Sequence, residues 1–294
     1  MEGAAAAVER IWPGQPAEIV PLDGGITNRN FKVDVGGGTF VLRMGGERTE
    51  LLGIDRTFEH AASVRAAEVG VGPEVVGFVE PEGWLVTRFI EGRRLGFEEM
   101  REPAVIGRVA TALRRFHDGP PIPGRFDAYA VVDEYRREAE RFGVQAPEQF
   151  DEARRAAERI RQARARQAAV PCHNDLLNAN FLDDGSIRIV DWEYAGMGDR
   201  FFDLANLSVN HEFSLDDDRV LLEAYFGVAR DADLASLRLM RFMSDFREAM
   251  WGVLQSAISA LDFDFAEYAG KHFARLEAAA SARDFDRYLD MAKG

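Results

Sequence analysis

One stretch, residues 172–206, constrains the fold of this chain more than any other part of the sequence. It reads CHNDLLNANFLDDGSIRIVDWEYAGMGDRFFDLAN and surrounds two short apolar runs with hydrogen-bonding side chains. The runs NFL and IRIVDW are separated by Asp-Asp-Gly-Ser, a pattern that predicts a β-hairpin with a tight turn. Because a hairpin brings its two ends together, Asn180 before the first strand and Asp191 after the second are expected to converge. Buried polar groups without partners are costly, so this density of them indicates that something binds there.

The residue types at this point suit a phosphoryl-transfer site. A carboxylate and an amide oxygen favour a hard cation such as Mg²⁺, which takes few protein ligands in addition to phosphate oxygens. Asp175 precedes the hairpin, where a base that accepts the proton of a substrate hydroxyl would stand. An Asp, an Asn five residues later and a second Asp match the phosphotransferase template. In the alternative interpretation, Asp175 caps a turn, Asn180 starts a strand and Asp191 caps a helix, but the three together favour the catalytic one.

The N-terminal third of the chain has the pattern of an antiparallel sheet. Between about residues 18 and 90, runs of β-formers alternate with glycine-rich turns. One segment, RTFEHAASVRAAEVG at 56–70, has helical spacing instead and stops at a glycine. We therefore predict a sheet with one inserted helix.

The remainder of the chain is typical of helices. Helical spacing appears in EPAVIGRVATALRRFHDG, VDEYRREAERF, QFDEARRAAERIRQARARQ and nearly everything beyond residue 214. The fold class is therefore α+β, with a small β lobe over residues 1–91 and a larger, mainly helical lobe over 92–294. A cleft is expected between the lobes near residues 88–95.

Charge and composition narrow the classes of partner. The formal net charge is −14, which would repel a phosphate backbone, so we expect no nucleic-acid partner. The apolar runs fall short of the roughly 20 residues that a membrane helix needs, so we expect no membrane insertion. A single cysteine, Cys172, excludes an internal disulfide. With a poor signal-peptide pattern at the N-terminus, the cytoplasm is the expected location.

The motifs HNDLLNANF and IVDWEYAGMGDRFFDLAN together resemble the choline/ethanolamine kinase branch of the aminoglycoside-phosphotransferase-like superfamily. That superfamily has the bilobal protein-kinase-like fold. The resemblance extends over about residues 20–280 and is strongest over 173–206. It implies an enzyme that uses ATP and Mg²⁺ to phosphorylate the hydroxyl of a small cationic alcohol.

The resemblance also implies roles for individual residues. Asp175 would be the catalytic base, and Asn180 and Asp191 would be the magnesium ligands. Asp203 would brace the catalytic loop from below, and His173 would be a hydrogen-bonded core residue with a similar structural part.

A glycine-rich turn, LDGGITNRNF, precedes this core and is a candidate phosphate-binding loop. The backbone N–H groups of Gly24 and Gly25 could cradle phosphates, and the side chains of Thr27 and Asn28 could add donors. Two adjacent glycines usually mark only a turn, and it is the position ahead of the kinase-like core that favours a binding role.

Arg43 in the strand TFVLRM stands where protein kinases place a lysine. The choline kinase branch also uses arginine there, and a guanidinium can bind phosphate through two donors. Glu59 in the inserted helix is the expected ion-pair partner of Arg43, although it could be a surface glutamate. Lys32 is the competing cation but faces away from its apolar neighbours. The backbone around Ile90 is expected to meet adenine.

Aromatic and acidic residues indicate where the acceptor would bind. Glu193 and Tyr194 follow Asp191 directly, and Trp251 and Tyr268 match aromatic positions of the family. Aromatic faces recognise quaternary ammonium groups, at roughly 0.5–2 kcal/mol per contact, and Glu193 could supply the counter-charge. Trp251 also belongs to a helical apolar stripe, which is usually core.

One departure from the family affects the choice of acceptor. Choline kinases often carry a second tryptophan one helical turn before Trp251, where this chain has Glu248. We take choline as the first candidate acceptor and ethanolamine as the second. An aminoglycoside phosphotransferase and a thiamine kinase are alternatives, and the aromatic residues argue against the former. A non-catalytic pseudokinase would be expected to lack the base or a metal ligand, and this chain has all three residues.

Overall fold

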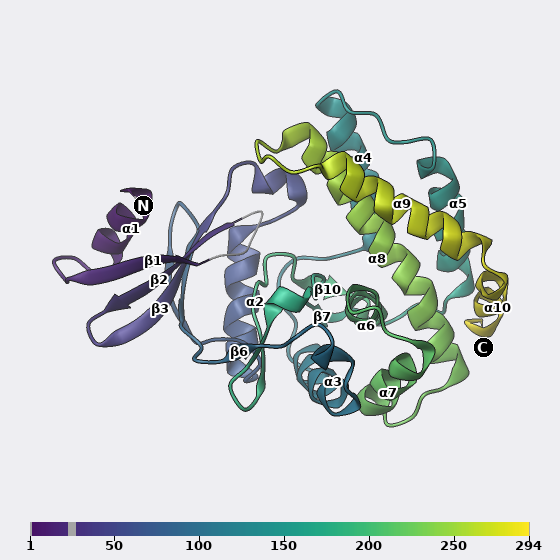
Figure 1. Ribbon diagram of the computed structural model, residues 1–294, viewed down its shortest axis with the longest axis horizontal. Helices are drawn as coiled ribbons and strands as arrows, with labels where there is room; N and C mark the ends of the chain where they lie inside the picture. Colours follow the sequence, from purple (N-terminus) through teal and green to yellow (C-terminus); the bar gives the residue numbers. More distant parts are fainter. Residues whose placement is uncertain (1, 23–27, 294) are drawn as a thin grey trace.

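The computed structural model describes residues 2–22 and 28–293. A β-rich lobe lies at one end of the long axis, and a larger helical lobe forms the rest (Figure 1). This arrangement confirms the predicted α+β, bilobal fold class. The predicted lobe boundary at residue 91 falls between strands β5 and β6 and stays a prediction.

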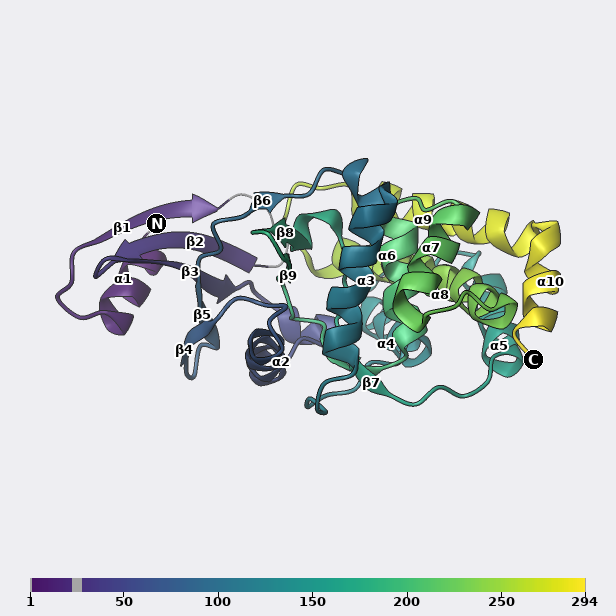
Figure 2. The ribbon, with the colours of Figure 1, turned by 90° about the horizontal axis from the view of Figure 1, so that it is seen from below.

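The N-terminal lobe is built on a five-stranded sheet with strand order β1-β2-β3-β5-β4. All neighbouring strands are antiparallel. The strands are β1 (Ala17–Leu22), β2 (Asn28–Val35), β3 (Gly38–Gly45), β4 (Val75–Val79) and β5 (Trp84–Arg88). Figure 2 shows the strands of this sheet one below another, to the left of the hairpin, with the helical lobe to the right.

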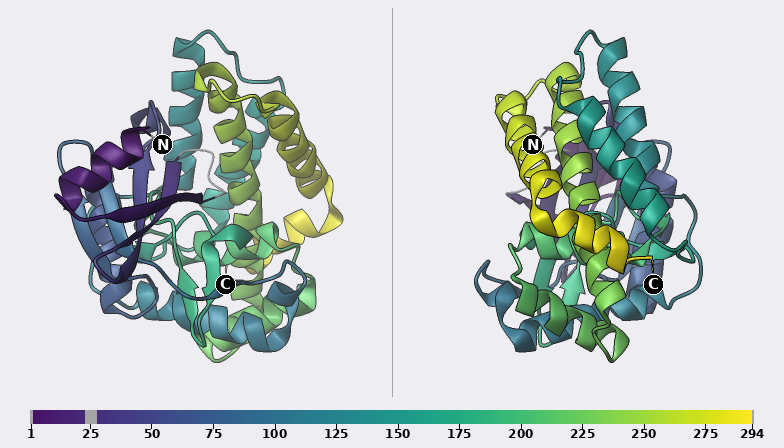
Figure 3. Two further views of the ribbon diagram at one scale, coloured as in Figure 1. Left: turned by 60° about the vertical axis from the view of Figure 1, so that its left-hand side comes forward. Right: turned by 90° about the vertical axis from the view of Figure 1, so that its right-hand side faces the viewer.

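Two helices flank this sheet. Helix α1 (Glu2–Ile11) packs Ala7 and Val8 against the face of the sheet that carries Phe31 and Val33, which alternate along β2 as expected for a half-buried strand. Figure 3 shows α1 crossing the outer side of the sheet.

The inserted helix that the sequence predicted is α2 (Arg56–Glu68), which follows the short η1 (Thr49–Leu52). It begins after Asp55 because that carboxylate accepts hydrogen bonds from the backbone N–H groups of Thr57 and Phe58. Glu59 in its first turn forms an ion pair with Arg43 on β3.

The C-terminal lobe is organised around one long helix, α8, which contacts α4, α6, α9 and α10. Most of its side chains are buried, as expected of a helix surrounded on several sides. In the right-hand view of Figure 3, the yellow α9 and α10 lie on one side of the lobe and the teal α5 lies beside them. The helices are η2 (Glu99–Arg101), α3 (Pro103–His117), α4 (Ala128–Arg141), α5 (Phe150–Ala163), α6 (Arg200–Asn210), α7 (Leu215–Phe226), α8 (Asp231–Ile258), α9 (Phe265–Ser281) and α10 (Arg283–Met291).

The predicted hairpin is present at the junction of the two lobes. Strands β8 (Phe181–Asp183) and β9 (Ile187–Ile189) pair in antiparallel register, and β6 (Arg93–Arg94) adds to the edge of β8. A second small sheet joins β7 (Val170–Cys172) to β10 (Gly196–Gly198). The sequence did not predict β7 or β10, because the whole hairpin segment separates these two short strands and no tight turn joins them.

Among the described residues, no helix is long and apolar enough to cross a membrane.

Candidate active site

A cavity of about 620 Å³ lies where the two lobes meet and is lined by residues from both. The predicted catalytic and nucleotide-binding residues that line it are Arg43, Glu59, Ile90, Asp175, Asn180 and Asp191. The predicted acceptor-binding residues that line it are Glu193, Tyr194, Glu248, Trp251 and Tyr268. Gly24, Gly25 and Thr27 lie outside the described residues.

The loop that carries Asp175 is held from below by Asp203. Strand β7 leads into this loop, and the Asp203 carboxylate on α6 accepts the backbone N–H groups of His173 at 2.8 Å and Asn174 at 2.7 Å. The His173 ring bonds to the carbonyl oxygen of Val190, 3.0 Å from its Nε2, and so ties the loop to the end of the hairpin. His173 and Asp203 therefore occupy the buried, bracing positions that the sequence predicted for them.

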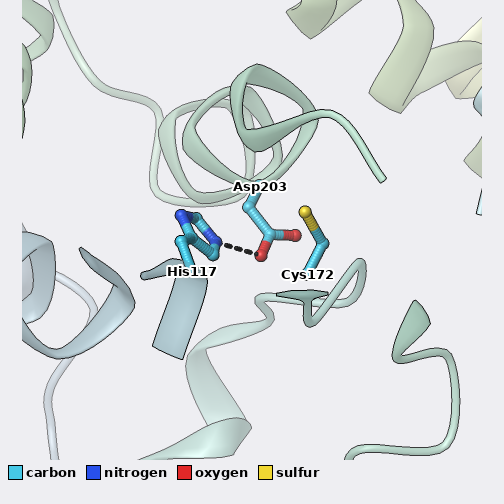
Figure 4. A group of neighbouring side chains, drawn as sticks. All are labelled: His117, Cys172 and Asp203. Carbon is cyan, nitrogen blue, oxygen red and sulfur yellow. Dashed lines mark hydrogen bonds and ion pairs between the residues drawn. The ribbon is translucent and has the colours of Figure 1, made fainter. Parts of the chain in front are cut away.

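His117, Cys172 and Asp203 are the group within the described residues whose ligand atoms lie close enough together for a metal ion. Figure 4 shows His117 and Cys172 on either side of Asp203, which extends from α6. Both ring nitrogens of His117 are already engaged, Nε2 with Asp203 at 2.9 Å and Nδ1 with the Tyr225 hydroxyl at 2.6 Å. Burial also raises the pKa of the Cys172 thiol well above its ordinary range. We conclude that this cluster is a hydrogen-bonded part of the core.

Asn180 and Asp191 lie at the two ends of the hairpin, as predicted, and both line the cavity. The amide nitrogen of Asn180 donates to the backbone carbonyl of Asp175 at 2.8 Å, which leaves the amide oxygen as a ligand. Asp191 has a left-handed backbone (φ 70°), and its carboxylate is bound by Arg43. Two oxygen donors beside a space large enough for phosphates fit a magnesium ion, which prefers such ligands.

A chain of alternating charges runs from Asp191 into the N-terminal lobe. Arg43 on β3 bonds both to Asp191 and, at 2.9 Å, to Glu59 on α2. Arg56 bonds to the other oxygen of Glu59 at 2.6 Å and to Glu193 at 3.1 Å. The expected Arg43–Glu59 ion pair is thus present and belongs to a network that joins the two lobes.

The end of β5 and the segment that follows it supply the backbone expected to meet adenine. The backbone N–H of Arg88 donates to Glu74, and that of Phe89 donates to Thr39, so both are already used by the sheet. Ile90 follows them and lines the cavity, which leaves it as the candidate from this segment.

Glu193 was predicted to provide a counter-charge for the acceptor, and besides lining the cavity it contacts the N-terminal lobe. Besides Arg56, its carboxylate accepts a hydrogen bond from the side chain of Asn28 at 2.9 Å. Asn28 is the first residue of β2 and directly follows Thr27 in the sequence. These contacts direct Glu193 toward the N-terminal lobe. Burial raises the pKa of Glu193 to about 7, and nearby Asp191 adds to this effect.

The aromatic residues predicted for the acceptor do gather in one group. Trp251 donates its indole N–H to the Tyr194 hydroxyl at 3.1 Å, and its ring meets that of Tyr268 edge-on with centroids 5.7 Å apart. Tyr268 donates its hydroxyl to the Glu248 carboxylate at 2.8 Å. Aromatic faces and a carboxylate are therefore available together, which is a suitable surround for a small cation.

Sequence reasoning missed two arginines at this site. Arg247, on α8, contacts both Asp175 and Glu248, and Arg56 joins Glu59 to Glu193. The signal for Arg247 was present, since a charged pair interrupts an otherwise apolar helical stripe. Arg56 lies one helical turn before Glu59, but neither spacing nor composition indicates a partner 137 residues away.

The environment of Asp175 affects its acidity. Burial, together with the nearby carboxylates of Glu248 and Asp191, raises the pKa of Asp175 to about 7, although the guanidinium of Arg247 acts in the opposite direction. A carboxylate that titrates near neutral pH is well matched to accepting a proton from a hydroxyl.

Comparison with known proteins places this architecture in a family. The model of the phosphotransferase enzyme family matches residues 18–240. A solved structure of a choline/ethanolamine kinase family protein from Mesorhizobium loti is similar, with 33% sequence identity and a TM-score of 0.86. The match covers 99% of this chain and 98% of that one.

Two curated proteins are more distant relatives. Protein LicA of Haemophilus influenzae is 28% identical over 69% of this chain, and the match spans only 61% of its own length. Choline/ethanolamine kinase of Rattus norvegicus is 24% identical over 87% of this chain and 78% of its own. The family expected from the motifs around Asp175 is thereby confirmed.

Proposed function

The chain belongs to the phosphotransferase enzyme family, and we propose that it is an ATP-dependent kinase of a cationic amino alcohol. The acceptor would be choline in the first place and ethanolamine in the second. One observation carries the proposal: a single cavity holds a buried carboxylate at Asp175, the oxygen ligands of the hairpin and the aromatic group around Trp251. Phosphoryl-transfer groups and a cation-binding surface are thus adjacent.

Asn180 and Asp191 are the residues that would hold Mg²⁺. The ion would neutralise charge on the phosphates of ATP and orient them for transfer. Arg43, kept in place by Glu59, would add a guanidinium on the phosphate side of the cavity.

Asp175 would orient the acceptor hydroxyl and accept its proton as the hydroxyl oxygen bonds to the γ-phosphorus and the bond to ADP breaks. No covalent intermediate on the protein is needed, because the contributions of the chain are positioning and charge.

The proposed acceptor rests on the chemistry of the residues that line the cavity and on the similarity to known proteins. Tyr194, Trp251 and Tyr268 offer aromatic surface, and Glu248 offers negative charge. The Mesorhizobium loti structure is described as a choline/ethanolamine kinase family protein, and the Rattus norvegicus relative as a choline/ethanolamine kinase. Thiamine, which also carries a cation and a hydroxyl, is an alternative acceptor outside the amino alcohols. An aminoglycoside would need a wider acidic groove.

A reduced cytoplasmic environment is also proposed for the protein. It rests on the single cysteine, Cys172, which is free and buried.

The test is phosphoryl transfer from ATP to choline, ethanolamine, thiamine and an aminoglycoside, with the products identified by ³¹P NMR. We expect phosphocholine or phosphoethanolamine to form fastest, and an Asp175→Asn variant serves as the blank. If only the aminoglycoside or only thiamine is phosphorylated, that compound replaces the proposed acceptor. If none of the four compounds is phosphorylated, the proposed kinase function is overturned.

A further inference from the structure

Helix α8 brings an arginine into direct contact with the loop that carries Asp175. Arg247 is only 2% exposed. Its Nη2 donates to Oδ1 of Asp175 at 3.1 Å and also to the backbone carbonyl of Asn174. One nitrogen therefore holds both the side chain of Asp175 and the peptide group that leads into it.

The guanidinium is itself fixed on its other sides. Its Nη1 donates to the Glu248 carboxylate at 2.5 Å, and its central carbon lies 4.9 Å from the centre of the Tyr194 ring. Tyr268 holds the second oxygen of Glu248. Because a planar guanidinium loses little freedom per hydrogen bond, such a clamp defines its position well.

The backbone at this point needs support from outside the loop. Asn174 has a left-handed conformation (φ 68°), which few residues other than glycine adopt readily. Its N–H is bound by Asp203, and the next N–H, that of Asp175, donates to Nδ1 of His173 at 3.2 Å. Arg247 supplies the remaining bond, to the carbonyl, so the peptide plane that enters Asp175 is held on both edges.

We propose that Arg247 is a positioning residue for phosphoryl transfer, which fixes one oxygen of Asp175 and leaves the other to meet the acceptor hydroxyl. The inference rests on the proposed function, since it takes Asp175 as the group that receives the hydroxyl. Arg247 acts through Asp175 and the Asn174 carbonyl.

Positioning of Asp175 accounts for the contacts of Arg247 better than acceptor binding or stabilisation of the fold does. A guanidinium would repel a cationic acceptor, so binding the acceptor is not the reason for placing it beside the aromatic group. A buried ion pair is also a poor stabiliser compared with apolar packing of similar volume. The hydrogen bonds to the catalytic loop are what an apolar residue could not provide.

The test compares Arg247→Lys and Arg247→Gln with the matched pair Arg241→Lys and Arg241→Gln. Arg241 lies on the same helix and is largely buried, but it bonds to Ser208 and to the Phe213 carbonyl, away from the cavity. For Arg247→Gln we expect kcat to fall about 10²-fold, the loss typical of a misplaced reacting group. The KM values for ATP and for the acceptor should stay within about threefold of wild type. Arg247→Lys should retain more activity, and the Arg241 variants should keep the wild-type kcat.

Chemical rescue separates positioning from a general structural role. Added guanidinium ion should restore part of kcat to Arg247→Ala and none to Asp175→Asn. A wild-type kcat in Arg247→Gln would overturn the proposal, as would a loss confined to the acceptor KM. If Arg247→Gln does not fold, Arg247→Lys and the rescue of Arg247→Ala decide.

A failure of the positioning role of Arg247 can be distinguished from a failure of the proposed kinase function. The acceptor panel with wild-type protein tests the function by itself. If no amino alcohol is phosphorylated, the same variants are compared in the release of phosphate from ATP to water, which also needs a hydroxyl placed at Asp175. An equal rate in wild type and Arg247→Gln would then contradict the positioning role.

Discussion

The guanidinium of Arg56, in the first turn of α2, lies 3.1 Å from the carboxylate of Glu193 in the C-terminal lobe. Both side chains are largely buried, so little solvent screens this ion pair. It joins the lobes at a point two residues beyond Asp191. A residue expected to face the acceptor is therefore part of the contact between the nucleotide-binding lobe and the metal-binding segment.

Replacing Glu193 should affect the nucleotide more than the acceptor. Glu193→Gln removes the charge that holds Arg56 and Asn28, and a hydrogen bond to a charged group is worth about 1.5–3 kcal/mol. We expect the KM for Mg-ATP to rise about tenfold while the acceptor KM stays near wild type. Glu248→Gln is the matched control, and in steady-state kinetics it should raise the acceptor KM and leave the KM for Mg-ATP near wild type. A rise confined to the acceptor KM of Glu193→Gln would return this residue to the acceptor site.

Arg43 should be needed for nucleotide binding. Arg43→Gln removes the cation that Glu59 and Asp191 hold at the cavity, and we expect the KM for Mg-ATP to rise at least tenfold, about 1.4 kcal/mol. Glu59→Gln should act in the same direction by a smaller factor, since the guanidinium remains but loses a partner. Lys32 lies on the neighbouring strand and is paired with Asp34, so Lys32→Gln should leave the KM for Mg-ATP at the wild-type value. Equal KM values for the Arg43 and Lys32 variants would contradict the assignment.

The pH dependence of the reaction should follow Asp175. Burial raises the pKa of this carboxyl to about 7, and only the ionised form can accept a proton. The acceptor kcat/KM should therefore fall as the pH drops through about 7. Because Glu248 raises the pKa of Asp175, Glu248→Gln should move this acidic limb to lower pH. A profile that is flat between pH 6 and 8 for wild type and variant would show that Asp175 does not titrate there.

Asp203 should contribute to stability without a metal ion. Burial favours its neutral form, but the hydrogen bond and charge of His117 and the contacts of His173 hold the pKa of Asp203 below its ordinary value. The resulting stabilisation is present above the pKa of the unfolded chain, near 4, and is lost as the pH falls through the lower, folded value.

Asp203→Ala should lower the free energy of unfolding at pH 7 by about 3–5 kcal/mol in urea titrations, the usual loss on breaking a buried charged network. Asp216→Ala, at an exposed position of α7, should change it by less than about 0.5 kcal/mol. Adding EDTA to wild type should leave the unfolding temperature unchanged. A drop with EDTA would identify the His117–Cys172–Asp203 cluster as a metal site.

The parts of the fold that the sequence predicted correctly are those with a local physical signal. The alternation of Phe31 and Val33 marked a half-buried strand, and the Asp-Gly turn at Gly185 (φ 100°) marked the hairpin. The spacing of Asp175, Asn180 and Asp191 then placed three side chains beside one cavity, because the hairpin between them has a fixed geometry.

The contacts that the sequence could not predict join segments far apart in the chain. The partner of Glu193 is 137 residues away, and that of Asp175 on α8 is 72 residues away. No periodicity or turn chemistry encodes such pairs, since they depend on how α2 and α8 pack against the hairpin. Arg56 could be found only when the tertiary arrangement was known, and the charged pair of Arg247 and Glu248 was visible in the sequence without its partner on the catalytic loop.

The most direct test of the account is a rapid-quench measurement of phosphoryl transfer from Mg-ATP to choline and ethanolamine by wild type and Asp175→Asn. Mg-ATP affinity is measured in parallel by calorimetry. We predict that wild type forms the phosphorylated amino alcohol, and that Asp175→Asn binds Mg-ATP normally but transfers at least 10²-fold more slowly. Transfer at the wild-type rate by Asp175→Asn would contradict the assignment of the catalytic base.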